Sequence, residues 1–125
     1  MIYFAHPVSD YDKPRERKCL ELISSQFKGV EILNPNQQCH NDAYRNGGGM
    51  DYFEKLVLSC DILVMVPFED YEYGMGVWRE AESCANHGGK VFALLPGLNT
   101  ISEIDFKDIR PLSINETRKR VKAGL

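Results

Sequence analysis

Apolar residues in this chain form short continuous runs, separated by longer segments in which they recur at helical spacing. The clearest run is Asp61–Pro67 (DILVMVP), and its apolar character from Ile62 onward predicts a strand buried on both faces of a parallel sheet. Three further segments have the length and composition of strands: Ile2–Ala5, Val30–Leu33 and Lys90–Leu95. A turn is expected at Pro96–Gly97, and Ile109–Leu112 is a candidate fifth strand at the sheet edge.

The segments between these runs predict four helices. The first begins after Asp12, because Pro14 is favourable in a first helical turn, and it extends toward Gly29. The last begins at Ser113, whose hydroxyl can form a capping box with Glu116 three residues later. The other two helices are expected at Met50–Ser59 and Met75–His87.

Strands and helices alternate along the whole chain, which predicts a doubly wound, three-layer α/β sandwich. The sheet is expected to be mostly parallel, with four or five strands in a flavodoxin-like or Rossmann-like order. A length of 125 residues fits one domain, residues 1–125. Ligands bind such sheets beyond the carboxyl ends of the strands. The segments at those ends are polar or glycine-rich: His6–Asp10, Asn34–Gln38, Phe68–Gly76 and Pro96. The long polar segment Gln37–Gly49 is expected to be a loop of functional importance.

The composition is that of an ordinary globular protein, with 43% hydrophobic and 26% charged residues. The net charge of −3 argues against a strongly basic nucleic-acid-binding protein. Two basic clusters, Lys13–Lys18 and Arg118–Lys122, are expected to be solvated helix faces. The apolar runs are far shorter than the ~20 residues of a membrane span, and Met1–Pro7 has no features of a signal peptide. We therefore expect a cytoplasmic protein that binds neither a nucleic acid polymer nor a membrane.

The four cysteines are spaced about twenty residues apart and form no C-x-x-C pair, which argues against zinc ribbons and redox motifs. Cys19, Cys60 and Cys84 stand among apolar residues and are expected to be buried, reduced thiols. The adjacent Cys39–His40 pair is the one place where a metal is conceivable, but no second pair of ligands follows it. We therefore expect neither a metal nor another cofactor.

Glu80 is the carboxylate most suited to chemistry. On the helix expected at Met75–His87, it lies at the edge of an apolar face that includes Val77, Ala81 and Cys84. That position holds its carboxylate near the carboxyl ends of the strands. The alternative is that an acid one turn into a helix only satisfies the preference for negative charge near a helix N-terminus.

Gly74 and Gly76 stand between a buried strand and this helix. They let a ligand approach the backbone and the helix N-terminus, or they only permit a tight turn. The dinucleotide pattern G-x-G-x-x-G is incomplete, because Arg79 occupies its last position. Gly47–Gly49 also has two interpretations: its backbone could bind a phosphate group, or it could be only a flexible loop.

Tyr3 lies within the first predicted strand, and a buried tyrosine requires a partner for its hydroxyl. His6, Ser9 and Asp10 follow that strand and are candidate polar contacts to a ligand. His6 is either a proton shuttle or a residue of the turn.

Taken together, these segments resemble the nucleoside 2-deoxyribosyltransferase-like superfamily, which includes deoxynucleotide N-hydrolases. The resemblance covers Met1 to about Leu95 and rests on the order and spacing of four segments: MIYFAHP, ILNPN, CDILVMVPF and GVWREAESCANHGGKVFAL. It implies cleavage or transfer at the N-glycosidic bond of a nucleoside or nucleotide, without a metal or cofactor. It also implies a homodimer, and exposure of Trp78 and the Tyr71–Tyr73 segment would provide the apolar surface for one.

The resemblance also implies roles for individual residues. Glu80 matches the nucleophile that attacks the anomeric carbon and forms a glycosyl-enzyme intermediate, and Tyr3 matches the tyrosine that orients it. Asp70 matches an acid that contacts the substrate. Asp61 matches an aspartate at the start of the third strand, for which a structural role is expected.

Two departures from the family pattern support an alternative function. Active members usually carry an aspartate eight residues before the position of Asp61, where this chain has Phe53; Asp51 or Glu54 could replace it only after a local shift. The phosphate loop of the family is replaced by AHPVSD. The alternative is a domain of the same fold that binds or senses a nucleotide-like ligand without turnover.

Overall fold

The computed structural model describes residues 1–37 and 49–125. Residues 38–48 of the predicted loop, which include Cys39–His40 and Gly47–Gly48, lie outside the described residues. The other predicted elements can be compared with the structure directly.

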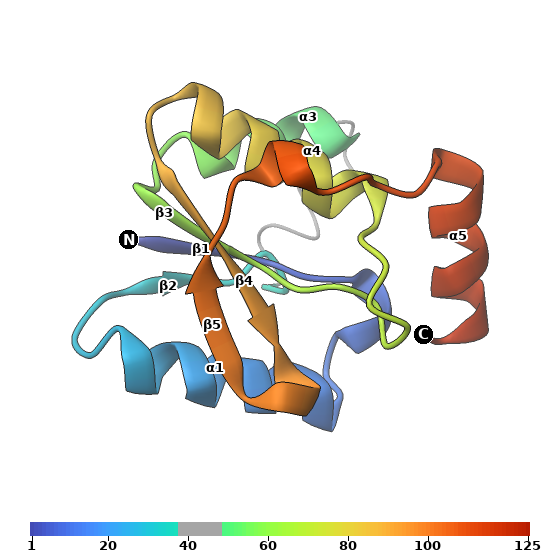
Figure 1. The fold of residues 1–125 in the computed structure, drawn as a ribbon, viewed down its shortest axis with the longest axis horizontal. Coiled ribbons are helices and arrows are strands. Elements are labelled where there is room, and N and C mark those ends of the chain that lie inside the picture. Colours follow the sequence, from blue (N-terminus) through green and yellow to red (C-terminus); the bar gives the residue numbers. More distant parts are fainter. Residues whose placement is uncertain (38–48) are drawn as a thin grey trace.

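The described residues form a five-stranded sheet with the order β2-β1-β3-β4-β5, in which the first four strands are parallel and β5 is antiparallel to β4. The strands are β1 (Ile2–Ala5), β2 (Ile32–Leu33), β3 (Ile62–Met65), β4 (Lys90–Leu95) and β5 (Thr100–Glu103). The helices are α1 (Pro14–Gln26), α3 (Gly49–Val57), α4 (Met75–Asn86) and α5 (Ile114–Ala123). Figure 1 shows α1 on one side of the sheet and α3 and α4 on the other. The predicted three-layer α/β sandwich is therefore confirmed.

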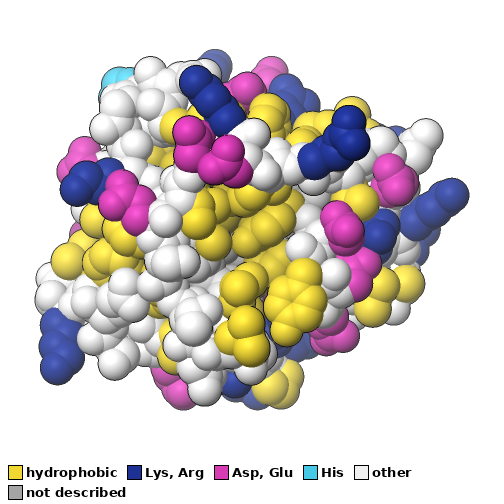
Figure 2. All heavy atoms as spheres, in the orientation of Figure 1, with side chains coloured by type: hydrophobic (Ala, Val, Ile, Leu, Met, Phe, Trp, Pro, Cys, Tyr) yellow, Lys and Arg dark blue, Asp and Glu magenta, His cyan; other side chains and the backbone are white. Residues whose placement is uncertain are grey.

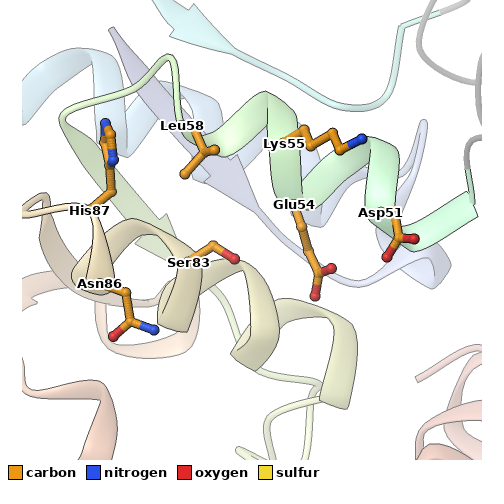
Figure 3. A pocket seen from close by; sticks show the side chains of 7 residues that line it. All are labelled: Asp51, Glu54, Lys55, Leu58, Ser83, Asn86 and His87. Carbon is orange, nitrogen blue, oxygen red and sulfur yellow. The ribbon is translucent and has the colours of Figure 1, made fainter.

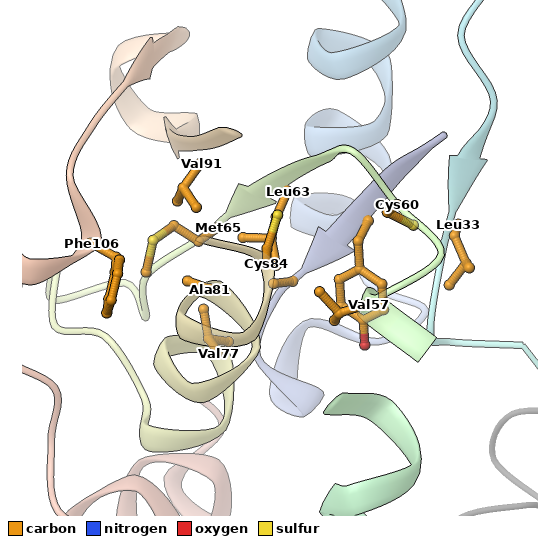
Figure 4. Close-up of a cluster of buried hydrophobic side chains, with 12 residues drawn as sticks. Leu33, Val57, Cys60, Leu63, Met65, Val77, Ala81, Cys84, Val91 and Phe106 are labelled. Carbon is orange, nitrogen blue, oxygen red and sulfur yellow. The ribbon is translucent and has the colours of Figure 1, made fainter. Parts of the chain in front are cut away.

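β1 is an interior strand that pairs with β2 on one side and β3 on the other, so its side chains meet the layers on both faces of the sheet. Successive side chains of a strand point to opposite faces. Ile2 and Phe4 accordingly pack into a cluster that includes residues of α1, whereas Tyr3 and Ala5 belong to a cluster on the other face. That second cluster, drawn in Figure 4, includes Val57 of α3 and Val77, Ala81 and Cys84 of α4. Tyr3 is thus buried on the same side of the sheet as α4.

The prediction of a strand at Ile109–Leu112 is wrong. The predicted turn is present as a short 3₁₀ helix, Pro96–Leu98, and Asn99 follows it in a left-handed conformation (φ 53°). The chain therefore reverses, and β5 returns along β4. Ile109 and Leu112 hydrogen-bond to α4 and to the loop before it instead: the Ile109 carbonyl accepts from Trp78 Nε1 at 3.2 Å, and the Leu112 amide donates to the Tyr73 carbonyl at 2.9 Å.

Trp78 is not exposed apolar surface, contrary to the expectation from the sequence. Its indole Nε1 also donates to the Phe106 carbonyl at 3.3 Å, and its ring packs edge-on against Phe106. Tyr73 is half-buried against the core, and Tyr71 alone of the three aromatic residues is strongly exposed, at 55%. The segment after β5 therefore covers part of Trp78, one of the residues expected to provide the apolar surface of a dimer.

The last helix, α5, docks beside the carboxyl ends of the strands (Figure 1). Its capping box between Ser113 and Glu116 is present, as predicted. Thr117 Oγ1 accepts a hydrogen bond from the Met75 amide at 3.0 Å, so a side chain of α5 caps the start of α4. No helix of the described residues combines the length and the apolar character that crossing a membrane requires.

Candidate active site

Tyr3 and Glu80 meet between the sheet and α4. Tyr3 projects from the interior strand β1, and Glu80 lies on the second turn of α4, which packs over that strand. The Tyr3 hydroxyl donates a hydrogen bond to Glu80 Oε2, as expected for a buried tyrosine. Tyr3 is fully buried, and Glu80 is 6% exposed. Two residues 77 positions apart in the chain are thus brought into contact by the sheet topology.

Burial determines the protonation of this pair. Removal from water raises the pKa of Glu80 to about 8, although the hydrogen bond from Tyr3 opposes the rise. The negative charge of Glu54 raises it further. Burial and the neighbouring Glu80 also raise the pKa of Tyr3, so its hydroxyl keeps its proton. At neutral pH the Glu80 carboxyl group is therefore largely protonated, which is typical of carboxyl groups tuned for acid–base or nucleophilic chemistry.

A surface groove of about 370 Å³ separates α3 from α4 (Figure 3). It is lined by Asp51, Glu54, Lys55, Leu58, Ser83, Asn86 and His87. Glu54 also pairs with Arg79 Nε at 2.8 Å, and Asp51 is exposed on the first turn of α3. Neither Tyr3 nor Glu80 lines this groove, so the groove and the candidate chemistry are in different places.

A second polar cluster occupies the carboxyl end of β1. His6 Nδ1 lies 3.0 Å from the Phe4 carbonyl, and His6 Nε2 lies 2.7 Å from Glu16 Oε2. A carbonyl oxygen only accepts, so His6 Nδ1 carries the proton in its contact with Phe4. The contact between His6 Nε2 and Glu16 Oε2 requires a second proton between these two atoms. The Asp12 amide and Asn36 Nδ2 also donate to Glu16. Four contacts from these three partners therefore converge on the Glu16 carboxyl group.

These contacts hold the pKa of Glu16 below its usual value. Burial raises that pKa, but the hydrogen bonds from His6, the Asp12 amide and Asn36 together outweigh it. The His6–Glu16 pair is therefore a hydrogen-bonded support at the end of β1.

The predicted ligand contacts after β1 are engaged within the chain. His6 uses both ring nitrogens, as described. The Ser9 hydroxyl donates to the Leu125 carbonyl, which ties this segment to the end of α5. Arg15 Nη1 bonds to Asp10 Oδ2 at 2.6 Å and to the Pro67 carbonyl at 2.8 Å. His6, Ser9 and Asp10 are all buried, and groups of the chain itself contact their polar side chains.

The remaining predicted residues are spread over the molecule. A Cβ atom on Gly74 would lie 3.1 Å from the Phe68 ring and 3.2 Å from the Thr117 methyl group, so packing explains this glycine. Gly76 is half-buried in the first turn of α4. Asp70 is exposed and pairs with Arg120 Nε at 2.8 Å. Asp61 is exposed at the amino end of β3, at the opposite edge of the sheet from the expected ligand site.

Sequence reasoning missed three residues of the cluster at the end of β1: Tyr11, Glu16 and Asn36. Asn36 belongs to a segment that was predicted at a strand end, and Tyr11 directly follows another. Proximity to the carboxyl ends of the strands was therefore the available signal. Nothing in the sequence distinguishes Glu16 from an ordinary acid in a first helical turn.

Within residues 1–37 and 49–125, no three His, Cys, Asp or Glu side chains are grouped as a metal site. Comparisons of the chain with protein-family models, with curated proteins and with solved structures found no match. The chemistry of the site must therefore be argued from its own geometry.

Proposed function

We propose that this protein cleaves or transfers the N-glycosidic bond of a nucleoside or nucleotide, with Glu80 as the nucleophile. The observation that carries the proposal is the buried hydrogen bond between the Tyr3 hydroxyl and Glu80. It joins the two residues that the family resemblance selects, from a strand and a helix far apart in the chain. The same bond leaves Glu80 Oε1 as the oxygen for attack.

In this mechanism, ionised Glu80 forms a bond to the anomeric carbon as the bond from that carbon to the base nitrogen breaks. The bonding electrons leave with the base, which takes up a proton from solvent. The transition state resembles an oxocarbenium ion, which a carboxylate stabilises. Water then releases the sugar from Glu80, or the nitrogen of a second base captures it. Tyr3 is a positioning residue, because it holds the carboxylate but does not contact the sugar.

The test is a chromatographic screen for base release from nucleosides and their monophosphates, with and without an acceptor base. Glu80→Gln preserves the size of the side chain and removes the nucleophile. We expect turnover to fall by roughly 10³-fold or more, because covalent stabilisation of the transition state is lost. Glu82→Gln on the same helix is the matched control and should retain activity, because Glu82 is outside the Tyr3 contact. Full turnover by Glu80→Gln would show that the nucleophile is another residue.

The second candidate is a domain that binds a nucleotide-like ligand without turnover. It is favoured by the apolar Phe53, 8% exposed on α3, where the related enzymes carry an acid. The same screen, combined with calorimetric binding measurements, separates the two functions. Binding of a nucleoside or nucleotide by the wild type, with no release of base from any of them, would favour this domain.

A further inference from the structure

Two basic segments that are far apart in the chain meet on one side of the molecule. Residues 13–18 lie at the start of α1, and residues 118–122 belong to α5. The Ser9 hydroxyl, which precedes α1, donates to the Leu125 carbonyl, and a Cβ atom on Gly124 would lie 3.9 Å from Lys13 Nζ. The end of α5 therefore lies against the start of α1. Figure 2 shows Lys and Arg side chains projecting from the side of the molecule on which α5 lies in Figure 1.

These segments concentrate positive charge in a chain whose net charge is −3. Residues 13–18 and 113–124 contain eight of the 15 Lys and Arg residues but only two of the 18 Asp and Glu residues. Both acids are engaged within the chain: Glu16 contacts His6 and Asn36, and Glu116 forms the capping box with Ser113. The small net charge therefore conceals a strongly basic region and an acidic remainder.

Six of the eight cations in these segments are exposed and form no ion pair. Arg15 Nη1 bonds to Asp10 Oδ2 at 2.6 Å, and Arg120 Nε bonds to Asp70 Oδ2 at 2.8 Å. In the part of the chain that the structure describes, no ion pair involves the other six, which we call the basic surface: Lys13, Arg17, Lys18, Arg118, Lys119 and Lys122. Like charges that lie close together repel one another, so an anion that bridges them is bound favourably.

The three cations that α5 contributes lie on its solvent side. At about 100° per residue, Arg118, Lys119 and Lys122 fall within about 100° of arc around the helix axis. Thr117 lies on the opposite side of α5, where its hydroxyl accepts from the Met75 amide. The helix is thus docked by one face and presents these cations to solvent on the other.

We infer that the basic surface binds a single-stranded nucleic acid through the phosphate groups of its backbone. Clustered Lys and Arg side chains bind such a backbone by charge, without reading the base sequence. α5 alone spans about 15 Å, the length of several phosphate groups along a strand. A flexible single strand can follow the surface from α1 to α5, which run in different directions (Figure 1), whereas a stiff duplex would contact one helix at a time. This binding uses no residue of the candidate active site, so it goes beyond the proposed function and does not depend on it.

Two other polyanionic partners fit the basic surface less well. An amphipathic helix binds an anionic membrane by inserting the apolar face opposite its charged face, but that face of α5 is docked against the protein through Thr117. A protein partner needs an apolar centre in its interface. The solvent side of α5 offers none, because it consists of Asn115, Arg118, Lys119 and Lys122. A nucleic acid backbone needs neither feature.

Fluorescence anisotropy with a labelled single strand of about 20 nucleotides tests the inference on the full chain. We expect a dissociation constant of roughly 1–100 µM at 50 mM salt, and a slope of log K against log salt between about −2 and −4, for roughly three to six phosphate contacts. Arg118→Gln/Lys122→Gln should raise the dissociation constant at least about 5-fold and make the slope shallower by about 1.4, because two contacts are lost. Lys13→Gln/Arg17→Gln should weaken binding in the same way, because both segments belong to one surface.

Lys28→Gln/Lys90→Gln is the matched control. It removes the same charge from two exposed lysines near the amino ends of the strands, at the opposite edge of the sheet from α5, and should leave the dissociation constant nearly unchanged. An equal loss in this control would overturn the inference, because net charge alone would then explain the binding. Wild-type binding that does not weaken with salt, or no binding at 50 mM salt, would also overturn it. Circular dichroism verifies that each variant is folded, as expected for substitutions at exposed positions.

Three competitors identify the partner: a duplex of the same sequence, polyglutamate, and vesicles that contain an anionic phospholipid. We expect each of them to displace the labelled strand less effectively than the unlabelled single strand does. Equal or stronger competition by one of them would assign the basic surface to a duplex, an acidic polypeptide or a membrane, and would overturn the inference.

Discussion

Glu80 has to lose a proton before it can act as a nucleophile, and its surroundings decide at which pH this happens. Its pKa is raised to about 8 by burial, with Tyr3 opposing the rise and Glu54 adding to it. The pH dependence of kcat/KM reports on the free protein. The two neighbours of Glu80 therefore provide independent tests of its role.

We expect kcat/KM for base release to increase from pH 6, with a midpoint near the Glu80 pKa of about 8 and a plateau above about pH 9. Tyr3→Phe removes the hydrogen bond that favours the carboxylate, so its midpoint should move to higher pH. Glu54→Gln removes a neighbouring negative charge, so its midpoint should move to lower pH. A profile recorded from pH 5 to 10 for the three proteins checks this, and identical midpoints would contradict the assignment of Glu80 as the titrating nucleophile.

The protonation of Glu80 also affects the free energy of unfolding. The folded state holds this proton up to about pH 8, whereas the unfolded chain releases it near the ordinary value of 4.5. The folded state therefore binds more protons between these values, and the stability of the wild type decreases as the pH rises through this range. Glu80→Gln does not titrate there, so its stability relative to the wild type should increase between pH 5 and 9, by up to roughly 4 kcal/mol.

Urea unfolding at pH 5, 7 and 9 measures this difference. Glu82→Gln is the matched control, and its stability relative to the wild type should stay nearly constant over the range. A difference between Glu80→Gln and the wild type that does not change with pH would mean that the carboxyl group is not buried as described.

At the scale of elements, α5 determines whether the start of α4 is open to a ligand. The sequence led us to consider Gly74 and the N-terminus of α4 as a place for ligand approach. In the structure the Met75 amide is occupied by Thr117 Oγ1, and the Thr117 methyl group packs near Gly74. The first turn of α4 is therefore used for docking α5.

Thr117→Val keeps the shape of the side chain and removes the acceptor for the Met75 amide. We expect it to lower the free energy of unfolding by about 1 kcal/mol, because one helix-terminal amide loses its partner. Thr100→Val, at an exposed position of β5, is the control and should change stability by less than about 0.5 kcal/mol. Chemical unfolding compares them, and equal stability of the wild type and Thr117→Val would show that α5 does not cap α4 in solution.

At the scale of the whole molecule, the number of subunits remains a prediction. The family resemblance implies a homodimer, but Trp78 is covered by the segment after β5. The exposed apolar residues that remain near the carboxyl ends include Val8, Tyr71 and Leu98, which are 59%, 55% and 60% exposed. Their exposure is compatible with a contact between copies at this edge of the sheet.

Light scattering at micromolar concentration checks this expectation. A homodimer has twice the 14.3 kDa mass of one chain. If the dimer forms through this edge, Leu98→Ser should shift the mass toward that of the monomer, whereas Leu58→Ser, at an exposed position just after α3, should not. A monomer of the wild type would contradict the prediction of a homodimer.

The sequence by itself determined the elements whose signal is local. The unbroken apolar run after Asp61 and the capping box at Ser113 each identified an element that the structure contains. The alternation of strands and helices was enough for the α/β class and a mostly parallel sheet. The resemblance to the transferase-like superfamily indicates Tyr3 and Glu80, and the structure brings these two residues into contact. These elements can be predicted from the sequence because hydrophobic periodicity and capping depend on residues only a few positions apart.

Only the tertiary structure decided which polar groups form hydrogen bonds within the chain. The sequence indicates Ser9 as a ligand contact and does not distinguish Thr117. In the structure, both side chains hydrogen-bond to distant segments of the chain. The chain reverses after β4, and β5 forms by pairing with β4. The alternation of hydrophobic and polar residues in 100–103 is too weak to predict this strand from the sequence. Whether a tyrosine hydroxyl is engaged, as it is in Tyr3, depends on a partner that is distant in the chain. Burial and long-range contacts, which set both the pKa of Glu80 and these hydrogen bonds, exist only once the sheet has formed.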